Sequence, residues 1–175
     1  MTFYDAEAER YAGALWRKRG RDPEREWLGA FHGPDLQAGR VAPLTVRYID
    51  ERLGHGVFSE APLAKGDYVG VYTGILIRRD LLRKRVNDYC FRYPVEAYSL
   101  RPLMIDAGQQ GNEMRFVNHS DRPNCETIGV PYRGLVYLLV RAAAPIAKGE
   151  QLTIDYGPAY WRHRKRRAKL SNIVT

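Results

Sequence analysis

The sequence has few cysteines and no long apolar run, and each absence excludes a class of protein. Its two cysteines, Cys90 and Cys125, are too few for the disulfide framework of a small secreted domain. A reducing compartment, cytosolic or nuclear, is therefore the expected setting. No apolar stretch approaches the roughly 18 residues of a membrane-spanning helix. The polar stretch from Met1 to Arg10 is not followed by the apolar segment of a secretory signal, so we expect a soluble protein.

The sequence also lacks the patterns of two common kinds of catalytic site. Asn118, His119 and Ser120 are adjacent, but neighbouring side chains diverge and no G-x-S-x-G motif occurs, which excludes a serine hydrolase. The four histidines and two cysteines show no metal-ligand spacing, so we expect no metal site.

The residues that are present indicate a folded, basic protein. With 45% apolar residues, the chain has enough hydrophobic material for a core, which excludes disorder over most of its length. Its 175 residues are most simply one domain. The net charge of +8 predicts attraction to acidic partners, including nucleic acid, but does not identify a function.

Local patterns divide the chain near residue 44. Apolar residues recur at helical spacing and predict a helix over Asp5 to Arg19. From Arg21 to Pro43 the periodicity is weak, and the prolines and glycines there favour loops. We therefore interpret residues 1–43 as an accessory helical and loop segment.

A series of short strands is expected from Leu44 onward. The predicted strands are Leu44–Ile49, Gly56–Ser59, Tyr68–Ile77, Phe91–Pro94, Met104–Ala107, Val136–Val140 and Leu152–Tyr156. Short strands separated by glycine and proline turns indicate a mostly β domain rather than alternating βαβ units. Asp80–Val86 is the helix expected inside this region. The basic run Arg162–Lys169 is interpreted as a solvated or capping helix, a nuclear-localisation-like signal or a nucleic-acid contact.

Three motifs each allow two interpretations when taken alone. The Gly54-His55-Gly56 segment is either a plain turn or bare backbone that a ligand approaches closely. The segment Gly149–Gly157 places Tyr156 at the end of an apolar strand face, as a core residue or as a catalytic phenol. The segment Met114–Asn124, MRFVNHSDRPN, is either a solvated turn or presents its polar groups to a ligand.

The chain resembles the SET-domain protein lysine methyltransferases in four motifs. In chain order these are GHG, YVGVYTG, IDAGQQGNEMRFVNHSDRPNC and KGEQLTIDYG. The specific part is the combination of RFxNHSxxPN with GExLTxDYG. The resemblance implies a mostly β fold with a few helices, built of small sheets with a knot-like threading of its carboxyl-terminal segment. We expect an N-terminal helical segment over residues 1–43, the SET domain over 44–161, and a basic tail or lid helix over 162–175.

The resemblance implies S-adenosyl-L-methionine as cofactor and a role for each matching residue. Tyr156 matches the catalytic tyrosine. The cofactor-binding residues would be Gly54, His55, Gly56, Tyr98, Arg115, Phe116, Asn118 and His119. The channel for the substrate lysine would be lined by Tyr72 and Ile154, with Tyr160 and Trp161 as either its wall or core packing.

Three positions depart from the family pattern, and one of them is Ile75, which stands where many relatives have a glutamate after the YTG motif. Ile154 stands where many relatives have phenylalanine or tyrosine, and its lack of a hydroxyl predicts di- or trimethylation. Asp121 replaces a cysteine that, in many relatives, joins three further cysteines around zinc, and no CxC cluster follows Tyr156. The resemblance therefore implies a zinc-free form, as in compact bacterial and viral members, and a bacterial protein of this kind can be delivered into a host cell.

The partner implied by the resemblance is a protein with a target lysine, a histone or another basic protein. Nucleic acid is a further candidate partner, on the interpretation of the basic tail as a nucleic-acid contact. Two rival interpretations stay open: a non-catalytic SET-like module that binds protein or nucleic acid, and an unrelated basic β-domain that binds nucleic acid.

Overall fold

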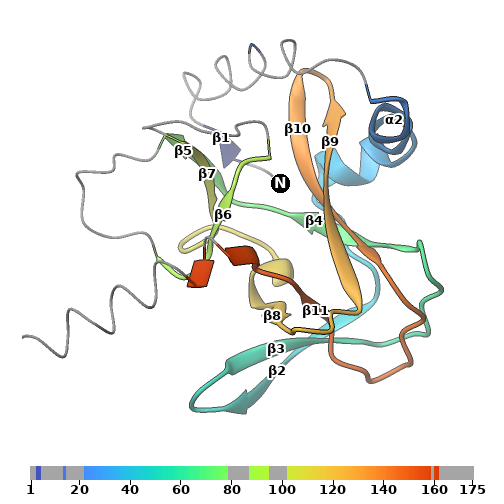
Figure 1. Ribbon diagram of the computed structural model, residues 1–175, viewed down its shortest axis with the longest axis vertical. Helices are drawn as coiled ribbons and strands as arrows, with labels where there is room; N and C mark the ends of the chain where they lie inside the picture. The colour runs from blue at the N-terminus through green and yellow to red at the C-terminus, as the bar shows by residue number, and fades with distance from the viewer. Residues whose placement is uncertain are drawn as a thin grey trace, which may run out of the picture.

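Small sheets and one long helix make up the part of the chain that the computed structural model describes, which is residues 3–4, 14, 22–78, 87–94, 102–158 and 160–161 (Figure 1). The predicted mostly β fold with an N-terminal helical segment is confirmed. The predicted helices over Asp5–Arg19 (apart from Ala14) and Asp80–Val86, the residue Tyr98, and the basic run Arg162–Lys169 lie outside the described residues.

A three-stranded antiparallel sheet lies at the centre, in the order β4-β10-β9. It consists of β4 (Tyr68–Tyr72), β9 (Cys125–Tyr132) and β10 (Leu135–Ala142). The β9–β10 turn has positive φ at both Arg133 and Gly134, the geometry that matches the twist of a two-residue hairpin. Strand β10 is buried on both faces: Leu138 and Val140 belong to one hydrophobic cluster, and Leu139 belongs to another. The sheet therefore separates two cores.

Helix α2 (Pro23–Ala38) covers one of these cores by packing against β9, β10 and β4 (Figure 1). The prediction of loops over these residues is wrong. Asp22 caps the helix by accepting from the main-chain N–H of Arg25, and Gly39 ends it in the left-handed conformation. A side chain at Gly29 would overlap the carbonyl group of Pro131. The glycines that resembled loop signals therefore permit close contact between helix and sheet.

The predicted strand Tyr68–Ile77 is two strands in different sheets. Strand β4 ends at Tyr72, and β5 (Ile75–Arg78) begins after Thr73 and Gly74. Buried Thr73 accepts from the main-chain N–H of Asn112 at 2.9 Å, and a side chain at Gly74 would meet the carbonyl of Asp106. Alternation alone could not reveal this change of sheet, because both strands are apolar.

Strand β5 belongs to a second sheet, in the order β1-β5-β7-β6. The other strands of this sheet are β1 (Phe3–Tyr4), β6 (Cys90–Arg92) and β7 (Leu103–Asp106). The β6 and β7 strands correspond to two of the predicted strands, shifted by one or two residues. The parallel pairing of β1 with β5 was not predicted.

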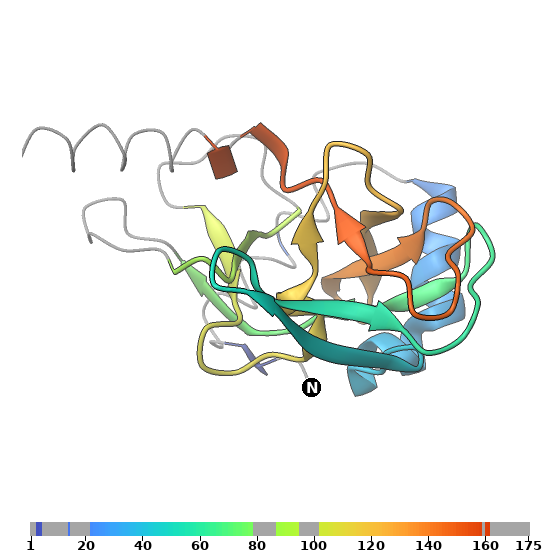
Figure 2. The ribbon, with the colours of Figure 1, turned by 90° about the horizontal axis from the view of Figure 1, so that it is seen from below.

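The remaining elements form a hairpin and a short parallel pair. Strands β2 (Leu44–Asp50) and β3 (Gly54–Ser59) form the hairpin, which crosses the front of the molecule in Figure 2. Strand β8 (Asn118–His119) follows the 3₁₀ helix η1 (Glu113–Phe116) and pairs with β11 (Thr153–Ile154). Two main-chain hydrogen bonds join the hairpin to the residues just before β11: the Ser59 N–H donates to the Glu150 carbonyl, and the Leu152 N–H donates to the Val57 carbonyl.

Three strands were missed because their local signals are poor. Strand β9 contains Gly129 and Pro131, which interrupt a strand pattern, and β1 and β8 have only two residues each. Within the described residues, no helix combines the length and apolarity needed to cross a membrane.

Candidate active site

The parallel pairing of β8 with β11 brings together the two motifs of the sequence that carry the most polar groups. Asn118 pairs with Thr153 and His119 pairs with Ile154, although 35 residues separate each pair along the chain. The Ser120 N–H also donates to the Ile154 carbonyl at 3.1 Å. The NHS segment and the carboxyl-terminal segment thus lie side by side in the structure.

Asn124, the second asparagine of the NHSDRPN segment, joins this segment to the start of β11. Its Oδ1 accepts from the main-chain N–H of Thr153 at 2.9 Å, and its Nδ2 donates to the Gln151 carbonyl at 2.9 Å. An amide side chain that offers both a donor and an acceptor can thus mimic a neighbouring strand. Asn124 holds the start of β11 in place beside β8.

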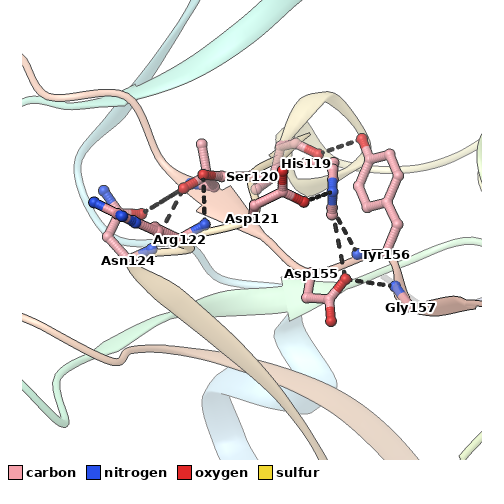
Figure 3. Close-up of polar contacts among 10 residues, drawn as sticks. His119, Ser120, Asp121, Arg122, Asn124, Asp155, Tyr156 and Gly157 are labelled. Atoms are coloured by element: carbon pink, nitrogen blue, oxygen red, sulfur yellow. Dashed lines mark hydrogen bonds and ion pairs between the residues drawn. The ribbon is translucent and has the colours of Figure 1, made fainter.

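Tyr156 lies just beyond β11 and is held at both ends. Its hydroxyl donates to the Val117 carbonyl at 2.8 Å, and its main-chain N–H donates to Nδ1 of His119 at 3.2 Å (Figure 3). The predicted face of this segment is confirmed, since Leu152 and Ile154 are buried, Tyr156 packs against the same core, and Asp155 is exposed.

Tyr72 is the second phenol in this region. It is buried, and its hydroxyl donates to the Tyr89 carbonyl at 2.6 Å. Burial raises the pKa of Tyr72, and the nearby groups Cys90 and Tyr156 raise it further. The Tyr72 hydroxyl therefore stays protonated at neutral pH and keeps its donated hydrogen bond.

Two further aromatic rings, those of Tyr160 and Trp161, pack against Tyr156 and His119. The Tyr160 ring lies 4.5 Å from that of Tyr156, and the Trp161 ring lies 4.9 Å from that of His119. Tyr160 and Trp161 are in turn 5.1 Å apart, centroid to centroid. The predicted channel residues Tyr160 and Trp161 thus belong to one cluster with Tyr156 and His119. Ile154, at 3% exposure, is buried in the core against which Tyr156 packs.

Four of the residues predicted to bind the cofactor, His55, Arg115, Phe116 and Asn118, lie close together between β3, η1 and β8. The Nδ2 of Asn118 donates to the His55 carbonyl at 3.0 Å, and the His55 ring lies 5.6 Å from the Phe116 ring. The Arg115 guanidinium lies over the Phe116 ring at 4.6 Å. Arg115 also donates to the Ala107 carbonyl at 3.0 Å, which fixes its position.

The two glycines of the GHG segment serve different purposes. Gly54 has φ +69°, the left-handed conformation that favours glycine, with open space where a side chain would lie. At Gly56, a Cβ would fall 2.6 Å from Ile49 and 2.8 Å from Gln151. The absence of a side chain at Gly56 therefore leaves room for the side chains of Ile49 and Gln151.

Tyr89 is a site residue that sequence reasoning missed. Its carbonyl accepts the Tyr72 hydroxyl, and its ring lies 5.9 Å from the Phe116 ring and 5.5 Å from the Arg115 guanidinium. Its sole signal in the sequence is an aromatic residue just before a predicted strand. Such a signal is too common to identify a site.

The side chains that commonly bind metal ions do not cluster in the described part of the chain. Cys90 and Cys125 are not joined to each other by a disulfide bond. Across the residues that the structure describes, no group of three or more His, Cys, Asp and Glu side chains is placed to hold a metal ion.

Comparison with known proteins identifies similar chains. A family model described as SET domain matches residues 54–157. The histone-lysine N-methyltransferase ash1 of Drosophila melanogaster is 34% identical over 124 residues, 69% of this chain and 6% of that protein. The human histone-lysine N-methyltransferase 2B is 33% identical over 109 residues, 59% of this chain and 4% of that protein. The N-lysine methyltransferase KMT5A-A of Danio rerio is 32% identical over 122 residues, 65% of this chain and 35% of that protein. The chain thus matches less than a tenth of the length of the first two relatives and about a third of the third.

Proposed function

Since the chain belongs to the SET-domain family, we propose that it transfers methyl groups from S-adenosyl-L-methionine to the side-chain amine of a lysine in a protein substrate. The observation that carries this proposal is the pairing of β8 with β11, which brings Asn118 and His119 next to Tyr156. The names of the three relatives support it, because all describe lysine methyltransferases and two describe histone-lysine methyltransferases.

The side chains beside β3 and η1 fit the chemistry of this cofactor. S-adenosyl-L-methionine, when bound, supplies a methyl group on a positively charged sulfur. The His55, Tyr48 and Phe116 rings offer aromatic surface for a purine. Arg115 contributes a positive charge that suits the carboxylate of the amino-acid part. The proposed cofactor-binding residues are Gly54, His55, Gly56, Arg115, Phe116, Asn118 and His119.

The two phenols would orient the substrate amine. Tyr156 and Tyr72 both donate their hydroxyl protons to main-chain carbonyls. Each oxygen therefore offers lone pairs to an N–H of the lysine amine, and orientation of this kind contributes several kcal/mol towards lowering a barrier. Methyl transfer needs the amine in its neutral form, which apolar surroundings such as Ile154 favour by desolvation. On this proposal Tyr156 acts by positioning, and no protein group has to serve as a strong base.

The substrate and the product are finer parts of the proposal. The expected substrate is a histone or another basic protein, supported by the names of the relatives. Ile154 carries no hydroxyl to hold a water beside the amine, and we propose di- or trimethyl-lysine as the product. Cys90 and Cys125 are not joined in a disulfide bond, which agrees with the reducing setting that we propose, the cytosol or the nucleus.

A labelling experiment tests the proposed activity. The purified chain is incubated with methyl-labelled S-adenosyl-L-methionine and a panel of basic proteins that includes histones, and labelled residues are mapped by mass spectrometry. We expect label on lysine. Tyr156→Phe should lower the rate on the order of 100-fold, because the phenol oxygen that orients the amine is lost.

The control variant is Tyr132→Phe, because Tyr132 packs in the cluster beneath α2, on the other side of the central sheet. It should leave the rate within about twofold of wild type, as expected for a substitution remote from the site. Cofactor binding by the Tyr156→Phe variant should persist. If no protein is labelled and the wild-type chain fails to bind the cofactor, the rival interpretation of a non-catalytic binding module replaces the proposal.

A further inference from the structure

The His119 ring has a polar neighbour at each of its two nitrogens (Figure 3). Nδ1 lies 3.2 Å from the main-chain nitrogen of Tyr156 and 3.6 Å from Oδ1 of Asp155. Nε2 lies 3.3 Å from Oδ1 of Asp121. The side chain is 18% exposed, so most of the ring is enclosed by its neighbours.

These contacts select one tautomer of the ring. The Tyr156 N–H is a donor, so Nδ1 must hold a lone pair and the ring proton must lie on Nε2. Nε2–H then points to the Asp121 carboxylate, which is an acceptor. Asp155 already accepts from the Gly157 N–H at 2.8 Å, and its 3.6 Å distance from Nδ1 is too long for a hydrogen bond.

The bond to Nδ1 holds the backbone of Tyr156 at the point where the strand has ended. Strand β11 ends at Ile154, so the Tyr156 N–H lies beyond the paired residues. A second anchor of Tyr156 is the Val117 carbonyl, which accepts a hydrogen bond from its hydroxyl. Both anchors belong to the segment that leads from η1 into β8. Main chain and phenol are therefore fixed relative to one short piece of chain.

From this geometry we infer that His119 is a positioning residue for Tyr156: its Nδ1 holds the Tyr156 main chain and thereby aims the phenol oxygen. The inference rests on the proposed function and refines it, since His119 would act on the rate of transfer through Tyr156 in addition to lining the cofactor pocket. Asp121 supports the required tautomer from the surface. Its carboxylate is fully exposed, so its own effect is small.

Two substitutions at one position separate a positioning role from loss of the ring. In His119→Asn, the side-chain oxygen lies the same number of bonds from Cα as Nδ1 and can still accept the Tyr156 N–H. In His119→Gln, the polar atoms lie one bond further out, near the position of Nε2. We expect His119→Gln to lower kcat on the order of 100-fold, because displacing a reacting group by about 1 Å has an effect of that size. By the same reasoning, His119→Asn should lower kcat less than about tenfold, because the bond to Tyr156 is kept.

The dissociation constant of the cofactor, measured by calorimetry, gives the second readout. Positioning predicts similar cofactor affinity for the Gln and Asn variants despite their different kcat values. His32→Gln, on α2 and remote from the site, controls for the general effect of removing a histidine. Equal kcat values for the two His119 variants, or a loss confined to cofactor affinity, would overturn the inference.

A readout without turnover keeps the inference testable if the chain methylates none of the chosen proteins. Nitrogen-15 NMR of the histidine side chains in the wild-type chain should find His119 with its proton on Nε2 and a bare Nδ1. The Tyr156 amide should be protected from hydrogen exchange in wild type and lose protection in His119→Gln. The opposite tautomer, or unchanged protection, would refute the positioning role and leave the proposed function standing.

Discussion

At the scale of single residues, the two phenols of the site share one arrangement. Tyr156 donates to the Val117 carbonyl, and Tyr72 donates to the Tyr89 carbonyl. A phenol whose proton is engaged in this way presents only its oxygen lone pairs to a ligand. Burial raises the pKa of Tyr72 above its usual range, so this hydroxyl, which is protonated at neutral pH in any case, keeps its proton in alkaline solution as well. The arrangement suits a substrate group that donates hydrogen bonds, as an amine does.

Ile154 gives a test of product multiplicity at the residue scale. It is buried two residues before Tyr156, in the core against which that tyrosine packs. Ile154→Tyr adds a hydroxyl and bulk at this place, so we expect products to shift towards monomethyl-lysine at exhaustive turnover. Mass spectrometry of a labelled substrate measures the shift.

Ile154→Leu is the matched control, because it keeps the volume and adds no hydroxyl. This variant should keep the wild-type distribution of products. Monomethyl-lysine as the sole product of the wild-type chain would refute the role proposed for Ile154.

At the scale of elements, α2 shows how closely a helix approaches a sheet when glycine faces it. Gly29 and Gly33 lie on the buried face, where Gly29 meets Pro131 and Gly33 meets the Tyr132 ring. The opposite face exposes Trp27 and Phe31, whose stacked rings lie 5.0 Å apart. The helix carries apolar residues on both faces, which hides the single-faced pattern that normally predicts an amphipathic helix.

Gly29→Ala tests how closely α2 packs against β9. Alanine is the better helix former by about 1 kcal/mol, but here its methyl group would overlap the Pro131 carbonyl. Overpacking of this kind costs about 1–3 kcal/mol, and the carbonyl belongs to β9 and cannot rotate away. We expect the free energy of unfolding, measured with urea, to fall by up to about 2 kcal/mol, the overpacking cost less the gain in helix propensity.

Ala30→Gln provides the control, because Ala30 is exposed on the same helix. The free energy of unfolding of this variant should stay within about 0.5 kcal/mol of wild type. A gain in stability for Gly29→Ala would mean that α2 is not held against β9 as described.

At the scale of the whole molecule, two hydrophobic cores share the central sheet. One lies beneath α2 and contains Leu28, Leu36 and Leu139. The other contains Leu138, on the opposite face of β10, and extends to Ile154 at the candidate site. The site is therefore built on the same core that holds β7 and β11, and global unfolding will remove it.

Cys125 links the stability of the whole fold to alkaline pH. Burial raises the pKa of its thiol from 9.0 to about 12. The unfolded chain therefore releases this proton first, and the contribution of Cys125 to stability is full below pH 9.0 and is lost as the pH rises towards 12. Its share of the slope is at most about 1.4 kcal/mol per pH unit.

Urea unfolding at a series of pH values from about 8 to about 11 measures this slope, because that range brackets the ordinary pKa of a thiol. In Cys125→Ala the free energy of unfolding should fall less steeply with pH, even though its value at about pH 8 is lower because of the cavity. Cys90→Ala is the matched control for removing a thiol. Equal slopes for wild type and Cys125→Ala would show that this thiol does not ionise differently in the two states.

The sequence alone determined the kind of fold and pointed to most of the side chains of the candidate site, with Tyr89 as an exception. Alternation predicted β2, and short apolar runs predicted β3, β7 and β10, each to within two residues of its ends, because apolar side chains report which positions of a strand are buried. The motif residues from Asn118 to Tyr156 were identified by type and order. Tertiary structure decided the rest: the packing of α2, the split between β4 and β5, and the bond from the Tyr156 N–H to His119. These depend on which distant segment returns to meet a residue, and a local pattern carries no information about that partner.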